Sequence, residues 1–398
     1  MIIEVIIASL LGIVFGIFTG LIPGVHVNLI VTLLFGASAY FLNLVNVVAL
    51  SSFIVSMSLV HTFLNAIPAI YLGAPEDEGD ALNVLPGHKM LLQGKGYEAL
   101  MLTLTGSTLA LIIGVLISPL IIMTLPIFYE TIEKYIGYIL IILVIFLVFR
   151  EKQKYWSFFV FILAGVYGLT VLNLDMRNPL FPMLSSLFGT AGLLISFKDK
   201  IKIPKQEICK LEIDKKEVIK ALSASTIIGS FVSVMPGLGP AQAAILGSQI
   251  VKLTDKGFLV LVGALETFGM IISFIALYSI EKARNGAVVV ISRLMGKIGL
   301  NDLIIFFCVA VFSGLIAVFL SLFFGRKFSS LITKINYQKL ILGIIALIVV
   351  MCIWLSGFIG LYVLIIGSFL GMVPVLLGIG RNHLMGCLLL PVILFFLL

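Results

Sequence analysis

Long apolar runs separated by short polar stretches dominate the chain. A bilayer core of about 30 Å needs about 20 apolar residues per helix. The pattern therefore predicts an all-α polytopic membrane protein with about 10 to 14 transmembrane segments, some of them broken or re-entrant. The apolar segments lie at 2–22, 25–44, 45–73, 99–127, 133–149, 155–173 and 181–197, and after a charged stretch at 217–235, 240–254, 257–280, 301–325, 338–355, 357–378 and 380–398.

Two Pro-Gly breaks interrupt this pattern at similar places in the two halves. The first lies in Gly20 to Asn28, within a run that would otherwise pass for one long helix. The second lies in Ser233 to Gln242. Paired breaks of this kind, placed alike in two halves, are typical of duplicated transporter folds whose substrate site lies at the broken helices.

The segments also divide evenly around the charged stretch. We therefore interpret residues 1–197 as a first membrane repeat, 198–216 as a charged cytoplasmic linker, and 217–398 as a second repeat. An odd number of segments per half inverts the second repeat relative to the first. His61-Thr62 and Glu266-Thr267 follow the two breaks at comparable distances, which agrees with a duplication.

Basic residues mark one side of the membrane. They concentrate around Arg150 to Lys154, from Lys198 to Lys216, and from Arg326 to Lys339. Because Lys and Arg are enriched in cytoplasmic loops, the three stretches are predicted to be cytoplasmic. Both termini of this multi-pass cell-membrane protein are then extracellular.

Composition excludes several other classes of protein. Charged residues make up only 11% of the chain and apolar residues 61%, against about 25% charged residues in soluble domains. The net charge of +7 comes mainly from the loops, so it indicates no nucleic-acid partner. The four cysteines are dispersed, without metal-site spacing. No catalytic motif or nucleotide-binding loop is present, so we expect no enzyme, no metal and no cofactor other than a coupling ion.

Each Pro-Gly break can present a helix N-terminus to a ligand. Proline removes a backbone donor and ends a helix, and the free N–H groups of the helix that follows bind carboxylates or phosphates well. A simple proline kink at a close helix contact is the alternative. The candidate substrate-binding residues are Gly20, Pro23, Gly24, Val25, His26, Asn28, Pro236, Gly237, Leu238, Gly239, Gln242 and Arg381.

Polar residues inside the apolar runs are candidates for ion coupling. Ionisable groups are costly in a bilayer and are usually functional there. A histidine or a buried carboxylate can carry a proton near neutral pH, and a carboxylate can instead bind Na⁺. The candidates are His61, Thr62, Asn65, Glu266 and Thr267.

Two further stretches leave alternatives open. Arg381, within Gly378 to Gly386, is either a bidentate anion ligand or an interfacial loop arginine. The acidic stretch Pro75 to Asp80 is either a solvated loop or a loop that folds back over the transport path.

Several motifs together resemble a known family. They are Gly16-x3-Gly20-x2-Pro23-Gly24, Leu72 to Asp77, Leu85 to Lys89, Gly94 to Leu100, Met235 to Gly239 and Gly380 to Gly386. The chain resembles the TctA/DUF112 family, the large membrane subunit of tripartite tricarboxylate transporters, and is most similar to its archaeal branch. This resemblance implies a secondary carboxylate transporter. It also implies two partners, a small membrane subunit and an extracellular binding protein.

The breaks and the resemblance favour a secondary active transporter. Its substrate is expected to be a small organic anion such as a di- or tricarboxylate, coupled to H⁺ or Na⁺, with alternating access between the two repeats. A lipid-handling protein, such as a flippase for an isoprenoid-phosphate carrier, is one alternative, because the same helix N-termini and Arg381 suit a phosphate. An intramembrane enzyme using His61 or Glu266 is a second alternative.

Overall fold

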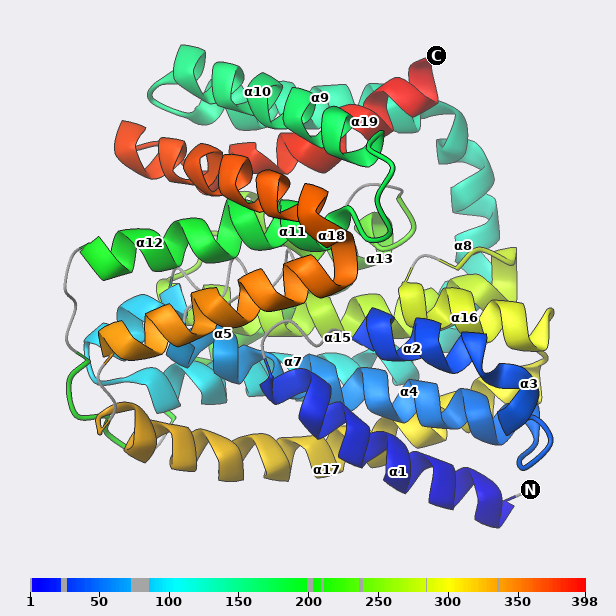
Figure 1. The fold of residues 1–398 in the computed structure, drawn as a ribbon. Helices are drawn as coiled ribbons and strands as arrows, with labels where there is room; N and C mark the ends of the chain where they lie inside the picture. The colour runs from blue at the N-terminus through cyan, green and yellow to red at the C-terminus, as the bar shows by residue number, and fades with distance from the viewer. Residues whose placement is uncertain are drawn as a thin grey trace.

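The computed structural model describes residues 2–22, 27–72, 86–198, 203–208, 211–235, 239–283, 285–334 and 337–398. These residues form helices joined by short connections, without a β-strand among them (Figure 1). The predicted all-α polytopic membrane class is therefore confirmed. Seven described helices are long and apolar enough to cross a membrane, or up to eight if the bent pair α8 and α9 is one span.

The helices pack into two bodies, which we call the cavity body and the wall body. The cavity body forms the lower part of Figure 1. It comprises α1 (Ile2–Leu21), α2 (Val27–Gly36), α3 (Ser38–Phe41), α4 (Val47–Leu64), α5 (Ala66–Leu72), α7 (Gly96–Leu116), α8 (Ser118–Ile132), α13 (Lys215–Val232), α14 (Pro240–Ile250), α15 (Asp255–Ile280), α16 (Gly286–Met295) and α17 (Leu300–Ile332).

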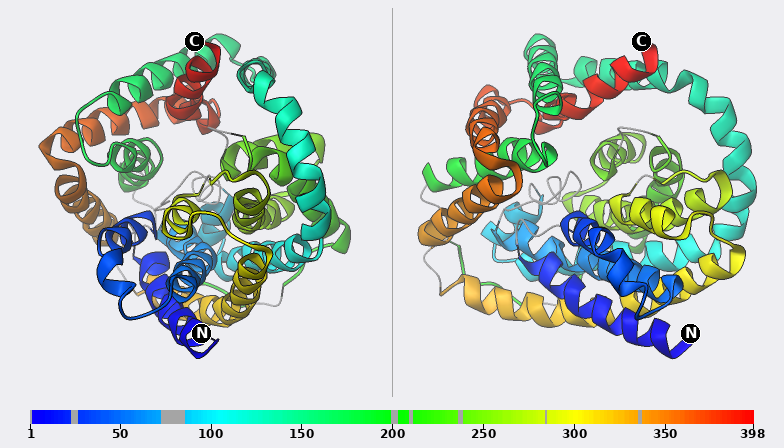
Figure 2. Two further views of the ribbon diagram at one scale, coloured as in Figure 1. Left: turned by 90° about the vertical axis from the view of Figure 1, so that its right-hand side faces the viewer. Right: turned by 45° about the vertical axis from the view of Figure 1, so that its right-hand side comes forward.

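The wall body lies above it in Figure 1, and α8 runs along the flank of the molecule toward it (Figure 2). The short 3-10 helix η1 (Glu133–Tyr135) connects α8 to this body. The wall body comprises α9 (Ile136–Arg150), α10 (Lys154–Leu172), α11 (Leu180–Leu184), the π-helix η2 (Ser185–Thr190), α12 (Ala191–Lys198), α18 (Tyr337–Leu377), the 3-10 helix η3 (Arg381–Met385) and α19 (Gly386–Leu397).

Each body contains helices from both halves of the chain. In the cavity body α4 packs against α1 and α17, and α15 packs against α13 and α7. In the wall body α10 packs against α19, and the segment from α11 to α12 packs against α18. The two halves of the sequence are therefore interleaved in space rather than side by side.

Small residues permit the closest of these helix crossings. A Cβ on Gly106 of α7 would lie 2.0 Å from the carbonyl oxygen of Val260, and one on Gly263 of α15 would lie 2.2 Å from that of Thr103. The α7 and α15 backbones thus touch at two reciprocal glycines. Such contact is how helices associate in lipid, where apolar burial gives little net gain.

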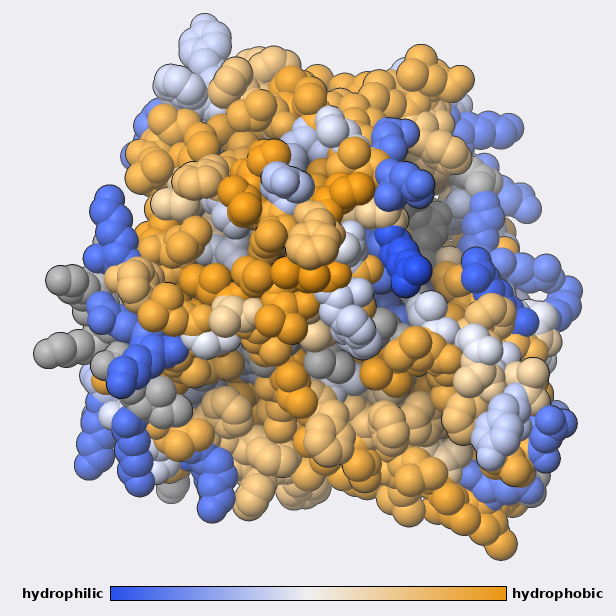
Figure 3. Space-filling view, viewed as in Figure 1, coloured by the Kyte–Doolittle hydropathy of each residue, from blue (hydrophilic) through white to orange (hydrophobic). Residues whose placement is uncertain are grey.

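Hydrophilic residues gather at two opposite edges of the molecule, and an apolar band lies between them (Figure 3). At the left edge of Figure 1 lie the α9–α10 turn, the end of α12 and the end of α17, which carry the three basic stretches. We call this the basic edge. Both chain termini lie toward the opposite, terminal edge.

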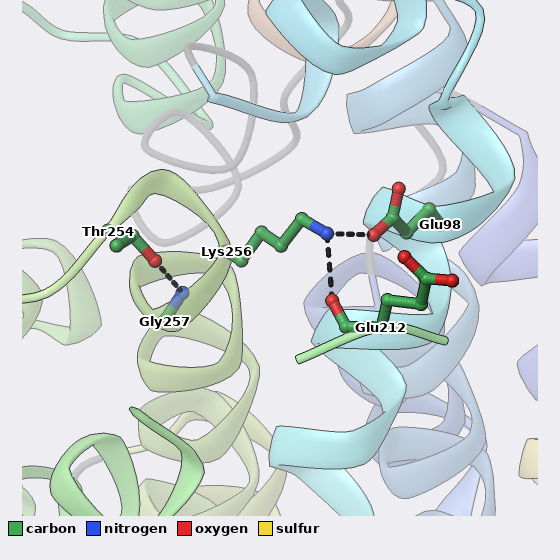
Figure 4. Close-up of polar contacts among 5 residues, drawn as sticks. All are labelled: Glu98, Glu212, Thr254, Lys256 and Gly257. Carbon is green, nitrogen blue, oxygen red and sulfur yellow. Dashed lines mark hydrogen bonds and ion pairs between the residues drawn. The ribbon is translucent and has the colours of Figure 1, made fainter. Parts of the chain in front are cut away.

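The described parts of the charged linker are docked onto the cavity body at the basic edge. Gln206 is buried; its Oε1 accepts from Gly96 N at 2.9 Å, and its Nε2 donates to Leu91 O at 2.9 Å. Lys256 of α15 pairs with the buried Glu98 of α7 and donates to the Glu212 carbonyl at 2.8 Å (Figure 4). We call the contacts of Gln206 and of Lys256 with Glu98 and Glu212 the linker clasp. They join both halves of the chain.

Candidate functional site

A cavity of about 410 Å³ with a partly polar lining is bordered by both bodies. Its volume falls within the range of about 300–1,000 Å³ that is usual for small-molecule sites. Leu184 of α11 and Leu388 and Val392 of α19 form an apolar wall on one side. The polar lining residues all come from the cavity body: Asn28, Thr62, Asn65, Ser233, Glu266, Ser273 and Asn285.

Three helix N-termini converge on this cavity. Asn28 lies in the first turn of α2, Pro240 begins α14, and Asn285 caps α16. Each N-terminus carries a partial positive charge and N–H groups that the helix itself leaves unpaired. Among the described lining residues, Glu266 is the one ionisable group. The cavity thus combines helix N-termini suited to an anion with one carboxylate suited to a cation or proton.

Several of the predicted site residues, from both halves of the chain, line this cavity. Asn28 and Gly239, which flank the two Pro-Gly breaks, both line it. Thr62 and Asn65 line it from α4 and its C-cap, and Glu266 lines it from the middle of α15. The exposed fraction is 2% for Asn65 and 8% for Glu266. Two segments that are distant in the sequence therefore share one polar space.

Part of the predicted site lies outside the described residues. This holds for Pro23, Gly24, Val25 and His26 of the first break and for Pro236, Gly237 and Leu238 of the second. It also holds for the side chain of Gln242 and for the acidic stretch from Pro75 to Asp80. Their predicted roles stay predictions.

Arg381 does not line the cavity. Its Nη2 donates at 2.9 Å to the carbonyl oxygens of both Leu187 and Phe188, within the π-helix η2. A π-helix leaves carbonyls poorly paired at its wide turn, and the guanidinium supplies their donor. Next to it, His383 lies 3.4 Å from Glu151. These contacts give Nη2 of Arg381 protein partners, and its predicted role as an anion ligand stays a prediction.

Three other predicted residues lie beside the cavity rather than on its lining. His61 and Thr267 are buried within α4 and α15. Gly20 lies at the α1–α4 crossing, where a Cβ would come 2.8 Å from the Leu64 Cβ. Gly20 therefore permits close helix packing, and the predicted ion-coupling roles of His61 and Thr267 stay predictions.

Three polar lining residues were not among the predicted site residues: Ser233, Ser273 and Asn285. Ser273 follows Glu266 by two helical turns, so the 3.6-residue period places it on the same face of α15. Asn285 precedes a glycine and an apolar run, which is an N-cap signal. The residues of α11 and α19 that form the apolar wall could not be identified from the sequence, because any apolar side chain would fit there.

The described parts of the family motifs Leu85 to Lys89 and Gly94 to Leu100 have a structural role at the basic edge. In the helix over 86–92, His88 is half-buried and its Nδ1 lies 3.4 Å from Ile70 O. Burial lowers the pKa of His88, so the ring is neutral at pH 7. Gly94 and Gly96 form the turn that receives the linker. The two motifs therefore build the linker clasp and lie away from the cavity lining.

A larger hollow of about 580 Å³ lies between α1, α2, α3 and α4. Its lining is apolar except for Glu4, and it includes the exposed side chains of Leu11 and Phe15. An acidic group in an apolar hollow would repel a phosphate headgroup. The hollow therefore gives no support to a site for an anionic lipid.

Comparisons with known proteins give a consistent result. The model of the tripartite tricarboxylate transporter TctA family matches residues 6–386. Uncharacterized protein MJ1079 of Methanocaldococcus jannaschii is 31% identical over 399 residues, covering 98% of this chain and 98% of the relative. No solved structure matches the chain.

Proposed function

The chain belongs to the tripartite tricarboxylate transporter TctA family, and from this premise we propose that it is a secondary active transporter of a small organic anion. The family consists of transporters and not of enzymes. This argues against an intramembrane enzyme that uses His61 or Glu266. The single observation that carries the proposal is the cavity where three helix N-termini meet Glu266. Its polar lining suits a hydrophilic anion such as a di- or tricarboxylate better than a lipid chain.

Glu266 is the proposed coupling residue. A carboxylate with an exposed fraction of 8% is costly to keep charged in a membrane. Binding of H⁺ or Na⁺ at Glu266 removes this cost and lowers the repulsion of an incoming anion. Anion and cation would therefore bind together, which is the requirement for symport. Thr62 and Asn65 are the proposed neighbours of the ion.

Two spacings support an inverted duplication. Glu4 and Glu217 are the third residues of α1 and α13, and each contacts the N-cap residue of a later helix, Asn46 of α4 or Thr254 of α15. Pro23 and Pro236 follow these glutamates at equal distances in the sequence. These matched contacts and the equal spacing are what we expect of two related units, and their inverted orientation remains part of the proposal.

Alternating access is best explained by movement of the cavity body against the wall body. Among the described lining residues, the polar groups belong to the cavity body, and those of the wall body are apolar. Among the described elements, the main direct contact between the bodies is that of α14 with η3. Because the described wall residues at the cavity are apolar, the cavity body could move past them without breaking a hydrogen bond there.

Transport is tested with purified protein in proteoliposomes. Counterflow of labelled citrate and of a panel of di- and monocarboxylates would be measured with an inward Na⁺ gradient, an inward H⁺ gradient, or neither. We expect at least one carboxylate to accumulate under one gradient, and protein-free vesicles to show no uptake. No carboxylate uptake under either gradient would contradict the proposal.

The orientation and the partners are further proposals. We expect the basic edge to face the cytoplasm and both termini to be extracellular. Labelling of single cysteines at Lys198 and at Leu398 in intact cells, with an impermeant reagent, checks this: only the second should react. By resemblance to the family, we also expect a small membrane subunit and an extracellular binding protein, which co-purification from the native membrane would detect.

A further inference from the structure

Asn285 occupies a fixed position at the edge of the cavity. It is the N-cap of α16, and its Oδ1 accepts from Ala287 N at 2.9 Å. Because the capped N–H needs an acceptor, this bond settles which end of the carboxamide is the oxygen. The amide NH₂ therefore points away from the first turn of α16, on a side chain that lines the cavity.

Among the described residues, the NH₂ group has only a weak acceptor as its partner. Its Nδ2 lies 3.5 Å from Met270 Sδ, and Met270 also lines the cavity. A thioether sulfur is a poor hydrogen-bond acceptor. Asn285 thus presents a strong donor, held in one orientation, beside an acceptor that a carboxylate oxygen would readily outcompete.

A second lining residue independently indicates a ligand. Asn65 is 2% exposed, and its Oδ1 has no hydrogen-bond partner among the described residues. A buried polar atom without a partner carries a desolvation cost that a bound group would remove. Because Oδ1 is an acceptor, it suits a coupling cation or a donor group of the ligand, whereas the NH₂ of Asn285 suits a carboxylate oxygen.

The neighbouring residue brings the two halves of the chain together at this point. A Cβ on Gly286 would lie 2.3 Å from Asn28 Oδ1, so the glycine allows Asn28 to lie against the first turn of α16. Asn28 from the first half and Asn285 from the second thus border the same helix N-terminus. Its partial positive charge favours an anion between them.

We propose that Asn285 is a specificity-determining residue of the transport site, whose Nδ2 donates a hydrogen bond to a carboxylate oxygen of the transported anion at the N-terminus of α16. This inference rests on the proposed function. It assigns a substrate contact to a residue outside the two Pro-Gly breaks, and it gives α16 a direct part in binding.

Replacing Asn285 by aspartate tests the contact. Asn285→Asp keeps the shape and still caps α16, but it exchanges the donor for a charged acceptor that repels a carboxylate. We expect the KM for the transported carboxylate to rise by about tenfold or more, with kcat and the melting temperature in detergent near those of the wild type. Asn285→Ser, which keeps a cap but removes the NH₂, should raise KM by a smaller factor.

The matched control is the reverse exchange at another helix cap. Asp214 caps α13 through its Oδ1, which accepts from Lys216 N at 3.0 Å, and it is exposed away from the cavity. Asp214→Asn should leave KM unchanged. A KM within twofold of the wild type for both Asn285 variants would overturn the inference and leave the proposed function intact. Failure of the wild type to move any carboxylate would instead overturn the proposed function.

Discussion

The cavity body and the wall body differ in how they use polar residues. Besides internally paired polar groups such as Glu98 with Lys256, the cavity body places some buried polar side chains, such as Asn65 and Glu266, around one shared space. The wall body uses its own internally: Tyr167 donates to Val363 O at 2.8 Å, and Arg381 binds carbonyls of η2. Polar groups that satisfy one another hold a body rigid, whereas polar groups around a cavity are available to a ligand.

A polar residue that lines a cavity and one that pairs inside the protein look the same in a sequence. Glu266 and Arg381 are both ionisable residues within or beside apolar runs. Only the packing shows that Glu266 borders a cavity and that Arg381 satisfies a π-helix. A polar residue in an apolar run therefore indicates that a partner exists, without saying whether the partner is protein or ligand.

The largest expected effect concerns the linker clasp, which ties the linker to the cavity body. Lys256→Met removes the partner of Glu98, a carboxylate with an exposed fraction of 3%. Loss of one member of a buried ion pair costs about 3 kcal/mol or more, so the apparent melting temperature in detergent should fall by several degrees.

The control for this variant is an exposed pair at the same edge. Lys89 lies 2.7 Å from Asp255, and both side chains are more than half exposed. Lys89→Met should cost less than about 1 kcal/mol. Equal melting temperatures for the two variants would show that the clasp does not hold the linker to the cavity body.

The next effect concerns the polar lining of the cavity body. Glu266→Gln keeps the size of the side chain but removes its charge, so ion binding should no longer be coupled to anion binding. We expect gradient-driven uptake to fall by about a hundredfold, near the upper range of coupling free energies, while counterflow without a gradient persists. Glu281→Gln, at the exposed C-cap of the same helix, is the control and should transport normally.

The smallest expected effect concerns the apolar wall. Val392→Trp adds bulk on the α19 face that borders the cavity, so it should hinder entry of the anion and lower kcat/KM by about tenfold. Phe395→Trp on the lipid-exposed side of α19 should leave transport unchanged. If Val392→Trp transports like the wild type, the wall does not border the path.

Much of the fold could be predicted from hydropathy alone. The broken segments appear as helix pairs, α1 with α2 and α13 with α14, on either side of the predicted Pro-Gly stretches. Asn28, Thr62, Asn65, Gly239 and Glu266 were predicted and do line one cavity. Asn285 and Ser273 were not, because a single asparagine or serine in an apolar run is common and carries no signal of which helix it faces.

By itself, the sequence determined that the chain is a multi-pass membrane protein, that two helices are broken near matched prolines, and which family it belongs to. These follow from local properties: an apolar run crosses a bilayer and a proline ends a helix, whatever the neighbours. Only the tertiary structure decided that the halves interleave into two bodies, that Arg381 binds η2, and that Asn285 faces the cavity. The reason is that helices in lipid choose neighbours by close packing of small residues, and hydropathy does not encode that choice.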